Sequence, residues 1–158
     1  MSGRGFGISQ LQRSYRIADA AANQRSMTPN TPQRREPATN VPAWVREHYR
    51  LVDAAALEQY IDDFAADVEL RFANFPPVRG RDAAREALAA GHAHHDMEHT
   101  IVGYFEDDAT STIEFEVLYT YRDGSTSTVP SCAVIHRDGA GRFDSVRIYL
   151  DQHGASGA

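Results

Sequence analysis

The sequence predicts one α+β domain, which spans residues 43–151 of the 158-residue chain. Three segments with apolar residues at three- and four-residue spacings come first, and four segments with strand-like alternation follow them. Short turn signals separate the later segments, so consecutive strands are expected to pair antiparallel. Helices that precede and cover an antiparallel sheet are typical of the α+β class.

The helical segments are predicted at 43–53, at 57–66 and from a cap at Asp82 to Gly91. A short strand, residues 68–72, lies between the second and third helices, and Pro76-Pro77 ends it because proline cannot continue a strand ladder. The first helix has its large side chains at helical spacing, and they are Trp44, Val45, His48, Tyr49, Leu51 and Val52.

The strands of the second half are predicted at 97–105, 113–121, 126–137 and 143–151. Apolar side chains occupy every other position from Ile113 to Tyr121, which is the period of a half-buried strand. Asp123-Gly124 predicts a hairpin turn after that strand, and the segment 139–141, Gly-Ala-Gly, predicts the next turn.

Residues 1–42 are expected to be a basic arm that ends in a proline-rich linker. Residues 1–40 carry six Arg and two acids, and the rest of the chain carries ten Arg and twenty acids. Ser9 can cap a short helix in the arm. We expect a solvated arm, with contact to an anionic partner or to the acidic domain as the alternative, and a flexible tail at 152–158.

Composition excludes several classes of protein. An acidic domain repels phosphate backbones, so nucleic-acid binding by the domain is not expected. No run approaches the roughly 20 apolar residues of a membrane span, and the N-terminus does not resemble a secretory signal. A single cysteine, Cys132, allows no internal disulfide. These features predict a cytoplasmic protein.

The order of these elements resembles the SnoaL-like, nuclear-transport-factor-2-like superfamily. Three segments carry the resemblance: YRLVDAAALEQYIDDFAADVELRF, PPVRGRDAAREAL and RFDSVRIYLD. The resemblance implies a cone, in which a curved antiparallel sheet wraps three helices around a small-molecule pocket, and a homodimer. Members of this superfamily include ketosteroid isomerases, polyketide cyclases, epoxide hydrolases and scytalone dehydratases, and others only bind partners, so fold alone does not assign function.

The sequence lacks the catalytic residues that two of these enzyme types need. A ketosteroid isomerase needs a carboxylate base before Pro-Pro, where residues 70–75 contain no acid, and Ala133 stands where its oxyanion acid would fall. A limonene-epoxide-hydrolase type needs an Asp-Arg-Asp arrangement, but Ile148 stands at the second acid.

Scytalone dehydratase pairs an aspartate at the end of the first long helix with a histidine early in the first long strand. Resemblance to that enzyme points to Asp53 and His99 here. An imidazole titrates near neutral pH, and a carboxylate beside it fixes its tautomer. We therefore expect His99 to be the acid or base and Asp53 to orient it. The alternative is that Asp53 caps the following helix and His99 is a structural histidine.

Other side chains are expected to line the pocket. His48 stands near the oxyanion tyrosine of the isomerases, and Asp151 ends the last strand as a second acid or as an arginine partner. Aromatic walls are expected from Trp44, Phe72 and Tyr119, which are equally compatible with a packed core.

The run from His92 to Asp96 could suggest a metal site, but it follows a helix C-terminus, and we expect a solvated loop without metal. The predicted function is therefore cofactor-free acid/base chemistry, meaning cyclisation, isomerisation, dehydration or epoxide opening, on an apolar oxygenated substrate such as a polyketide or terpenoid. The alternative is a non-catalytic ligand-binding or dimerisation module of the same fold.

Overall fold

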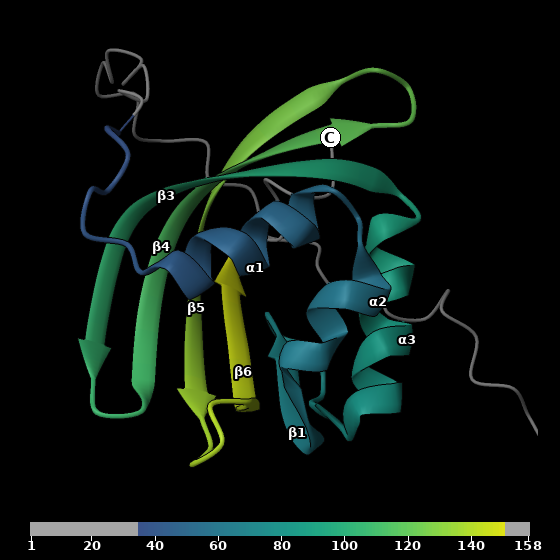
Figure 1. Ribbon diagram of the computed structural model, residues 1–158. Coiled ribbons are helices and arrows are strands. Elements are labelled where there is room, and N and C mark those ends of the chain that lie inside the picture. Colours follow the sequence, from purple (N-terminus) through teal and green to yellow (C-terminus); the bar gives the residue numbers. More distant parts are fainter. Residues whose placement is uncertain (1–34, 151–158) are drawn as a thin grey trace, which may run out of the picture. The chain divides into compact units, whose positions relative to one another are not determined.

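The computed structural model of the protein describes residues 35–150, so the predictions for the arm up to residue 34, for Asp151 and for the tail lie outside the described residues. Three α-helices, one short 3-10 helix and six strands make up this part of the chain (Figure 1). In chain order they are α1 (Ala43–Asp53), α2 (Leu57–Tyr60), η2 (Ile61–Asp63), β1 (Phe64–Phe72), β2 (Val78–Arg79), α3 (Arg81–His92), β3 (His95–Asp107), β4 (Thr110–Tyr121), β5 (Thr126–Arg137) and β6 (Phe143–Leu150).

The strands form one curved sheet in the order β2-β1-β6-β5-β4-β3. All neighbouring strands are antiparallel except β1 and β6, which run parallel. The sheet does not close on itself, and the helices lie on its concave side, with α1 running across it (Figure 1). The α+β class and the curved sheet around three helices are confirmed. No helix within residues 35–150 is long and apolar enough to cross a membrane.

The second helix is shorter than its spacing predicted. After α2 the chain tightens into η2, and Phe64 takes extended backbone angles, φ −87° and ψ 138°. β1 then begins at Phe64, which pairs in parallel with Phe143 on β6. Phe64 and Ala65 are almost fully buried. The pairing of β1 with β6 therefore overrides the helical pattern that continued to Ala66.

Gly80, and not Asp82, occupies the N-cap of α3. Gly80 has φ +89°, a left-handed conformation that glycine adopts at little cost, and its amide donates to the carbonyl oxygen of Val68 at 2.8 Å. Asp82 lies within the first turn of the helix and makes no side-chain cap hydrogen bond. A carboxylate in that turn still favours the helix dipole.

The core lies between the concave face of the sheet and the helices. On β4 the buried positions alternate, as the period-two pattern predicted, and they are Ser111, Ile113, Phe115, Val117 and Tyr119. Val45 of α1 packs against this face and is fully buried. Val41, which the sequence analysis placed in the linker, is 5% exposed and also lies in the core.

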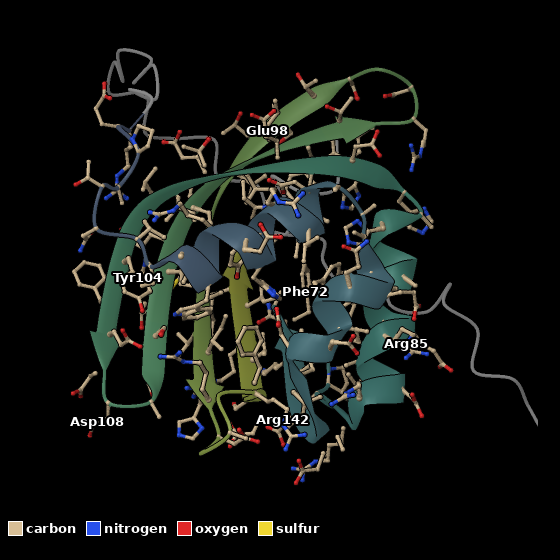
Figure 2. All side chains as sticks on the ribbon, viewed as in Figure 1. Phe72, Arg85, Glu98, Tyr104, Asp108 and Arg142 are labelled. Carbon is tan, nitrogen blue, oxygen red and sulfur yellow. The ribbon has the colours of Figure 1, made fainter. Side chains whose placement is uncertain are left out.

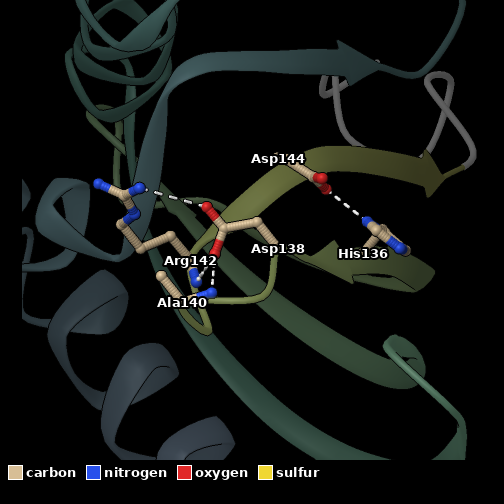
Figure 3. Close-up of polar contacts among 5 residues, drawn as sticks. All are labelled: His136, Asp138, Ala140, Arg142 and Asp144. Atoms are coloured by element: carbon tan, nitrogen blue, oxygen red, sulfur yellow. Dashed lines mark hydrogen bonds and ion pairs between the residues drawn. The ribbon is translucent and has the colours of Figure 1, made fainter.

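The turn between β5 and β6 is the Gly-Ala-Gly turn expected from the sequence (Figure 3). The Asp138 carboxylate accepts hydrogen bonds from the amides of Arg142 and Ala140, at 2.9 and 2.8 Å. These bonds hold the pKa of Asp138 below its usual range. Nearby, His136 Nδ1 lies 2.5 Å from Asp144 Oδ1. The turn thus fixes the register of β6 against β5. On its other side β6 pairs with β1.

Candidate functional site

A cavity of about 520 Å³ lies between the concave face of the sheet and the three helices. Most of its wall is aliphatic or aromatic, and Phe72 on β1, 38% exposed, is part of that wall (Figure 2). Among the described residues, no Asp, Glu, Arg or Lys lines the cavity. Its polar lining consists of His48, Tyr49, Tyr60, His92, His94, His95, His99, Tyr119 and Ser131. Apolar walls with a few polar groups are typical of small-molecule sites.

Asp53 and His99 are in contact at the cavity wall. Asp53 is the last residue of α1, and His99 is on β3, so the helix C-terminus delivers the carboxylate to the strand. His99 Nδ1 lies 2.6 Å from Asp53 Oδ1, and the His99 backbone amide donates to both carboxylate oxygens at 3.2 and 3.1 Å. The carboxylate therefore fixes both the backbone and the ring of His99.

This contact assigns a proton to one nitrogen of the ring. Because an ionised carboxylate only accepts, Nδ1 carries a hydrogen, and in the neutral ring Nε2 holds the lone pair. Nε2 has no hydrogen-bond partner in the described part of the chain and is not sealed inside the protein. The ring lines the cavity, with Tyr49 and Phe115 at centroid distances of 5.0 and 5.2 Å. In this tautomer the Nε2 lone pair is the free hydrogen-bond acceptor of the His99 ring.

Tyr49 is a polar group of the cavity that the sequence analysis did not single out. Its phenol has no hydrogen-bond partner within residues 35–150 and is not sealed from open space. Burial, with the neighbouring Cys132 and Asp53, raises the pKa of Tyr49 well above its usual range. The phenol therefore stays protonated and can donate to a bound oxygen. Its i, i+4 spacing from Asp53 on α1 was the signal that could have identified it.

His48 makes a second histidine–aspartate contact. His48 Nδ1 lies 2.6 Å from Asp63 Oδ2 in η2. Only 5% of His48 is exposed, and aromatic rings from α1, α2, β1 and β6 contact its ring, namely Tyr49, Tyr60, Phe64 and Phe143. His48 was expected at the pocket, but nothing in the local sequence indicated Asp63 as its partner.

The histidine run from the end of α3 into β3 is only in part the solvated loop that we expected: Ala93 and His94 form an exposed turn, whereas His92 and His95 pack against other residues. His92 Nε2 lies 3.0 Å from the hydroxyl of Tyr60, and the ring of His95 packs on Tyr119 at 4.7 Å. Burial, followed by neighbouring histidines, lowers the pKa of both His92 and His95. Both imidazoles therefore stay neutral at neutral pH. No three His, Cys, Asp or Glu side chains within residues 35–150 are placed to hold a metal ion.

The remaining predicted site residues divide into two groups. Phe72 and Tyr119 line the large cavity, as His48 and His99 do. Trp44 does not, because its ring packs on Phe143 and under the Arg137 guanidinium, 4.6 Å from the ring centroid. It lines a smaller neighbouring cavity of about 290 Å³ instead. Asp151 lies outside the described residues.

Comparison with known proteins agrees with this architecture. A candidate polyketide cyclase from Xanthomonas campestris superimposes with a TM-score of 0.65 at 18% identity, over 69% of this chain and 88% of that chain. A protein of ketosteroid isomerase-like fold from Catenulispora acidiphila, in complex with trimethylamine, gives 0.65 at 18% identity, over 72% and 89%. A candidate polyketide cyclase from Pseudomonas putida gives 0.65 at 14% identity, over 70% and 91%.

At these identities the likeness shows a shared fold and no shared activity. A search of curated proteins found no match to the sequence. The model of the SnoaL-like domain matches residues 45–145, which include most of α1, the sheet up to the start of β6, and the contacts of His99 with Asp53 and of His48 with Asp63. The chain therefore belongs to the SnoaL-like family.

Proposed function

We propose that the protein is an enzyme that moves protons, without a cofactor, on a neutral apolar molecule bearing oxygen. The reaction class is cyclisation, isomerisation, dehydration or epoxide opening, and polyketides and terpenoids have the required chemistry. The observation that carries the proposal is the contact of His99 with Asp53 at 2.6 Å on the wall of an apolar cavity.

The lining of the cavity supports this substrate class. A volume of about 520 Å³ suits a molecule of two or more rings, and the aliphatic and aromatic wall favours apolar surface. A charged substrate would lose its hydration without gaining a counter-ion from the lining. The depressed pKa values of His92 and His95 keep these imidazoles neutral, so they add no positive charge to the wall at neutral pH.

Three groups divide the work in the proposed reaction. His99 Nε2 removes a proton from carbon or hydroxyl, and the Asp53 carboxylate stabilises the imidazolium that results. The Tyr49 phenol donates a hydrogen bond to the oxygen on which negative charge develops. His99 then returns the proton to another atom of the substrate, which completes a dehydration or an isomerisation.

The proton abstraction can be measured with 5-nitrobenzisoxazole, a neutral bicyclic probe. A base removes its only ring C–H proton adjacent to nitrogen, the N–O bond breaks, and coloured 2-cyano-4-nitrophenolate forms. We expect saturable turnover by the native protein, and a loss of about 10²–10⁴ in rate for H99Q, as for removal of a positioned general base. Folding of H99Q is checked by its circular dichroism.

The matched control is H136Q. His136 also contacts an aspartate, Asp144, at 2.5 Å, but it lies outside the cavity lining. H136Q should keep the native rate. Equal rates for H99Q and the native protein would contradict the proposal. Saturable binding of the probe with no turnover would also contradict it, in favour of a non-catalytic ligand-binding module.

A further inference from the structure

We infer that His48 and Asp63 form a second proton-transfer pair, which connects the large cavity to solvent. The inference rests on the proposed function, since it assigns this pair the exchange of protons between the reaction site and water. It starts from one placement: His48 lines the large cavity and the smaller cavity beside it, and Asp63 lines only the smaller one.

The two side chains differ sharply in exposure. The His48 side chain is 6% exposed, whereas that of Asp63 is 44% exposed. Their contact at 2.6 Å joins a buried imidazole to a carboxylate that reaches water. By contrast, the carboxylate of Asp53 is 26% exposed and accepts three contacts from His99. Asp63 is therefore the more open of the two carboxylates to exchange with solvent.

The second nitrogen of His48 is available to the cavity. Nδ1 is the atom beside Asp63, and Nε2 has no hydrogen-bond partner among residues 35–150. Buried polar groups with a purely structural role are nearly always hydrogen-bonded. Nε2 of His48 has no such bond and is not one of the fully buried polar atoms that lack a partner, so it is not enclosed by protein. Nδ1 is engaged by Asp63, which lines only the smaller cavity, so Nε2 is the unengaged nitrogen of a ring that also lines the large cavity.

The surroundings of His48 leave Asp63 as its proton partner. Two phenols face the ring, Tyr49 from α1 and Tyr60 from α2, and burial raises the pKa of both, that of Tyr60 to about 12. They therefore neither supply nor take up a proton near neutral pH. In the smaller cavity the charged groups are Asp63, Glu47 and Arg137, and of these only Asp63 contacts the imidazole.

Proton passage through the ring balances. Nε2 takes a proton from the cavity, the Nδ1 proton moves to Asp63, and Asp63 releases it to water. The ring then carries hydrogen only at Nε2. Nδ1 regains a proton from water through Asp63, and the imidazolium so formed donates its Nε2 hydrogen to a substrate, which restores the starting ring. No bond other than N–H and O–H bonds changes, so no further reactant is needed.

The position of the pair suits the proposed reaction. The rings of His48 and His99 both contact the ring of Tyr49, at centroid distances of 5.1 and 5.0 Å. A molecule that reaches one imidazole therefore lies near the other. Reactions such as dehydration need one group to remove a proton and another to donate one, and no described carboxylate lines the cavity to serve as the second group.

The inference is tested on the full protein without ligand. In protein labelled with ¹⁵N in the histidine rings, we measure by NMR the rate at which the His48 Nδ1 hydrogen exchanges with water. We expect D63N to slow this exchange by about 10²-fold or more, because the amide oxygen still accepts the hydrogen bond but cannot carry a proton. D63E, which keeps a carboxylate, should restore the native rate, and D144N, whose carboxylate contacts a histidine outside both cavities, should leave it unchanged.

An unchanged His48 exchange rate in D63N would overturn the inference, as would equal slowing in D63E and D63N. These outcomes do not depend on a substrate, so they leave the result of H99Q with 5-nitrobenzisoxazole intact. Conversely, a native protein that fails to turn over the probe refutes the proposed function, while the exchange measurement still decides whether His48 and Asp63 conduct protons.

Discussion

Replacing Asp53 with asparagine tests the contact on which the site depends. The carboxylate holds His99 through the ring Nδ1 and through the backbone amide of β3. Asparagine has nearly the same shape but is neutral and has only one acceptor oxygen. Its NH₂ group would take the place of one carboxylate oxygen and face a hydrogen-bond donor of His99, so at least one of the contacts is lost. D53N therefore removes a charge and an acceptor without removing volume.

The expected cost follows from these contacts. Hydrogen bonds to a charged group contribute about 1.5–3 kcal/mol each, and a neutral bond contributes about 0.5–1.5 kcal/mol. Removal of a negative charge from the C-terminus of α1 returns about 0.3–1 kcal/mol. With the His99 and Asp53 side chains 11% and 26% exposed, screening by water is modest. We expect D53N to lower the free energy of unfolding by about 2–4 kcal/mol.

Urea unfolding followed by tryptophan fluorescence measures this change. Trp44 is the single tryptophan, and it packs on Phe143 in the same domain. In an H99A background only the backbone bond remains to be lost, so D53N should cost less there than in the native protein. The control is D144N, whose histidine contact is more exposed and should contribute below about 1 kcal/mol. Equal effects of D53N and D144N would refute the reasoning.

Two further predictions concern the aromatic and histidine lining. Y49F should slow turnover of 5-nitrobenzisoxazole by about 10²–10³-fold with little change in stability, because the phenol has no partner within residues 35–150. Y60F, which loses the contact with His92, should instead lower the free energy of unfolding. A stability loss in Y49F and a rate loss in Y60F would contradict the assigned roles. The free energy of unfolding should fall as the pH is lowered from about 7.5 to 5.5, because His92 and His95 have pKa values below their usual 6.5 in the folded protein and take up protons more readily when unfolded. Asp123 and Asp138 titrate below 3.8 and do not affect this range, so H92N/H95N should flatten the dependence, and a slope unchanged in that variant would contradict the assignment.

Local sequence periodicity correctly predicted those helices and strands in which the sequence pattern agrees with the packing in the folded domain. The bounds of α1 and β5, Ala43–Asp53 and Thr126–Arg137, match the prediction, because an amphipathic face and a turn signal define each of them. Phe64 was assigned to a helix because its spacing from Tyr60 is helical. Its true position on β1 depends on parallel pairing with β6, about 80 residues later, which no local pattern contains.

Part of the candidate site could be predicted from the sequence, and the rest depends on tertiary packing. Resemblance to a known family pointed to Asp53 and His99, and the structure places them in contact. Asp63 could not be identified as the partner of His48, because α2 and η2 set the approach of these residues through tertiary packing. His92 was misjudged because a histidine at a helix C-terminus is usually solvated, whereas here Tyr60 of α2 covers it.

The central claim is that a neutral apolar molecule binds in the large cavity within reach of His99 Nε2. A crystal structure of the full protein with 2-naphthol tests it directly. We predict that the rings lie against the apolar wall and that the hydroxyl lies about 2.6–3.2 Å from His99 Nε2, the distance over which a general base acts. A ligand bound outside the cavity, or a His99 ring turned away from the bound hydroxyl with Nδ1 released from Asp53, would contradict it.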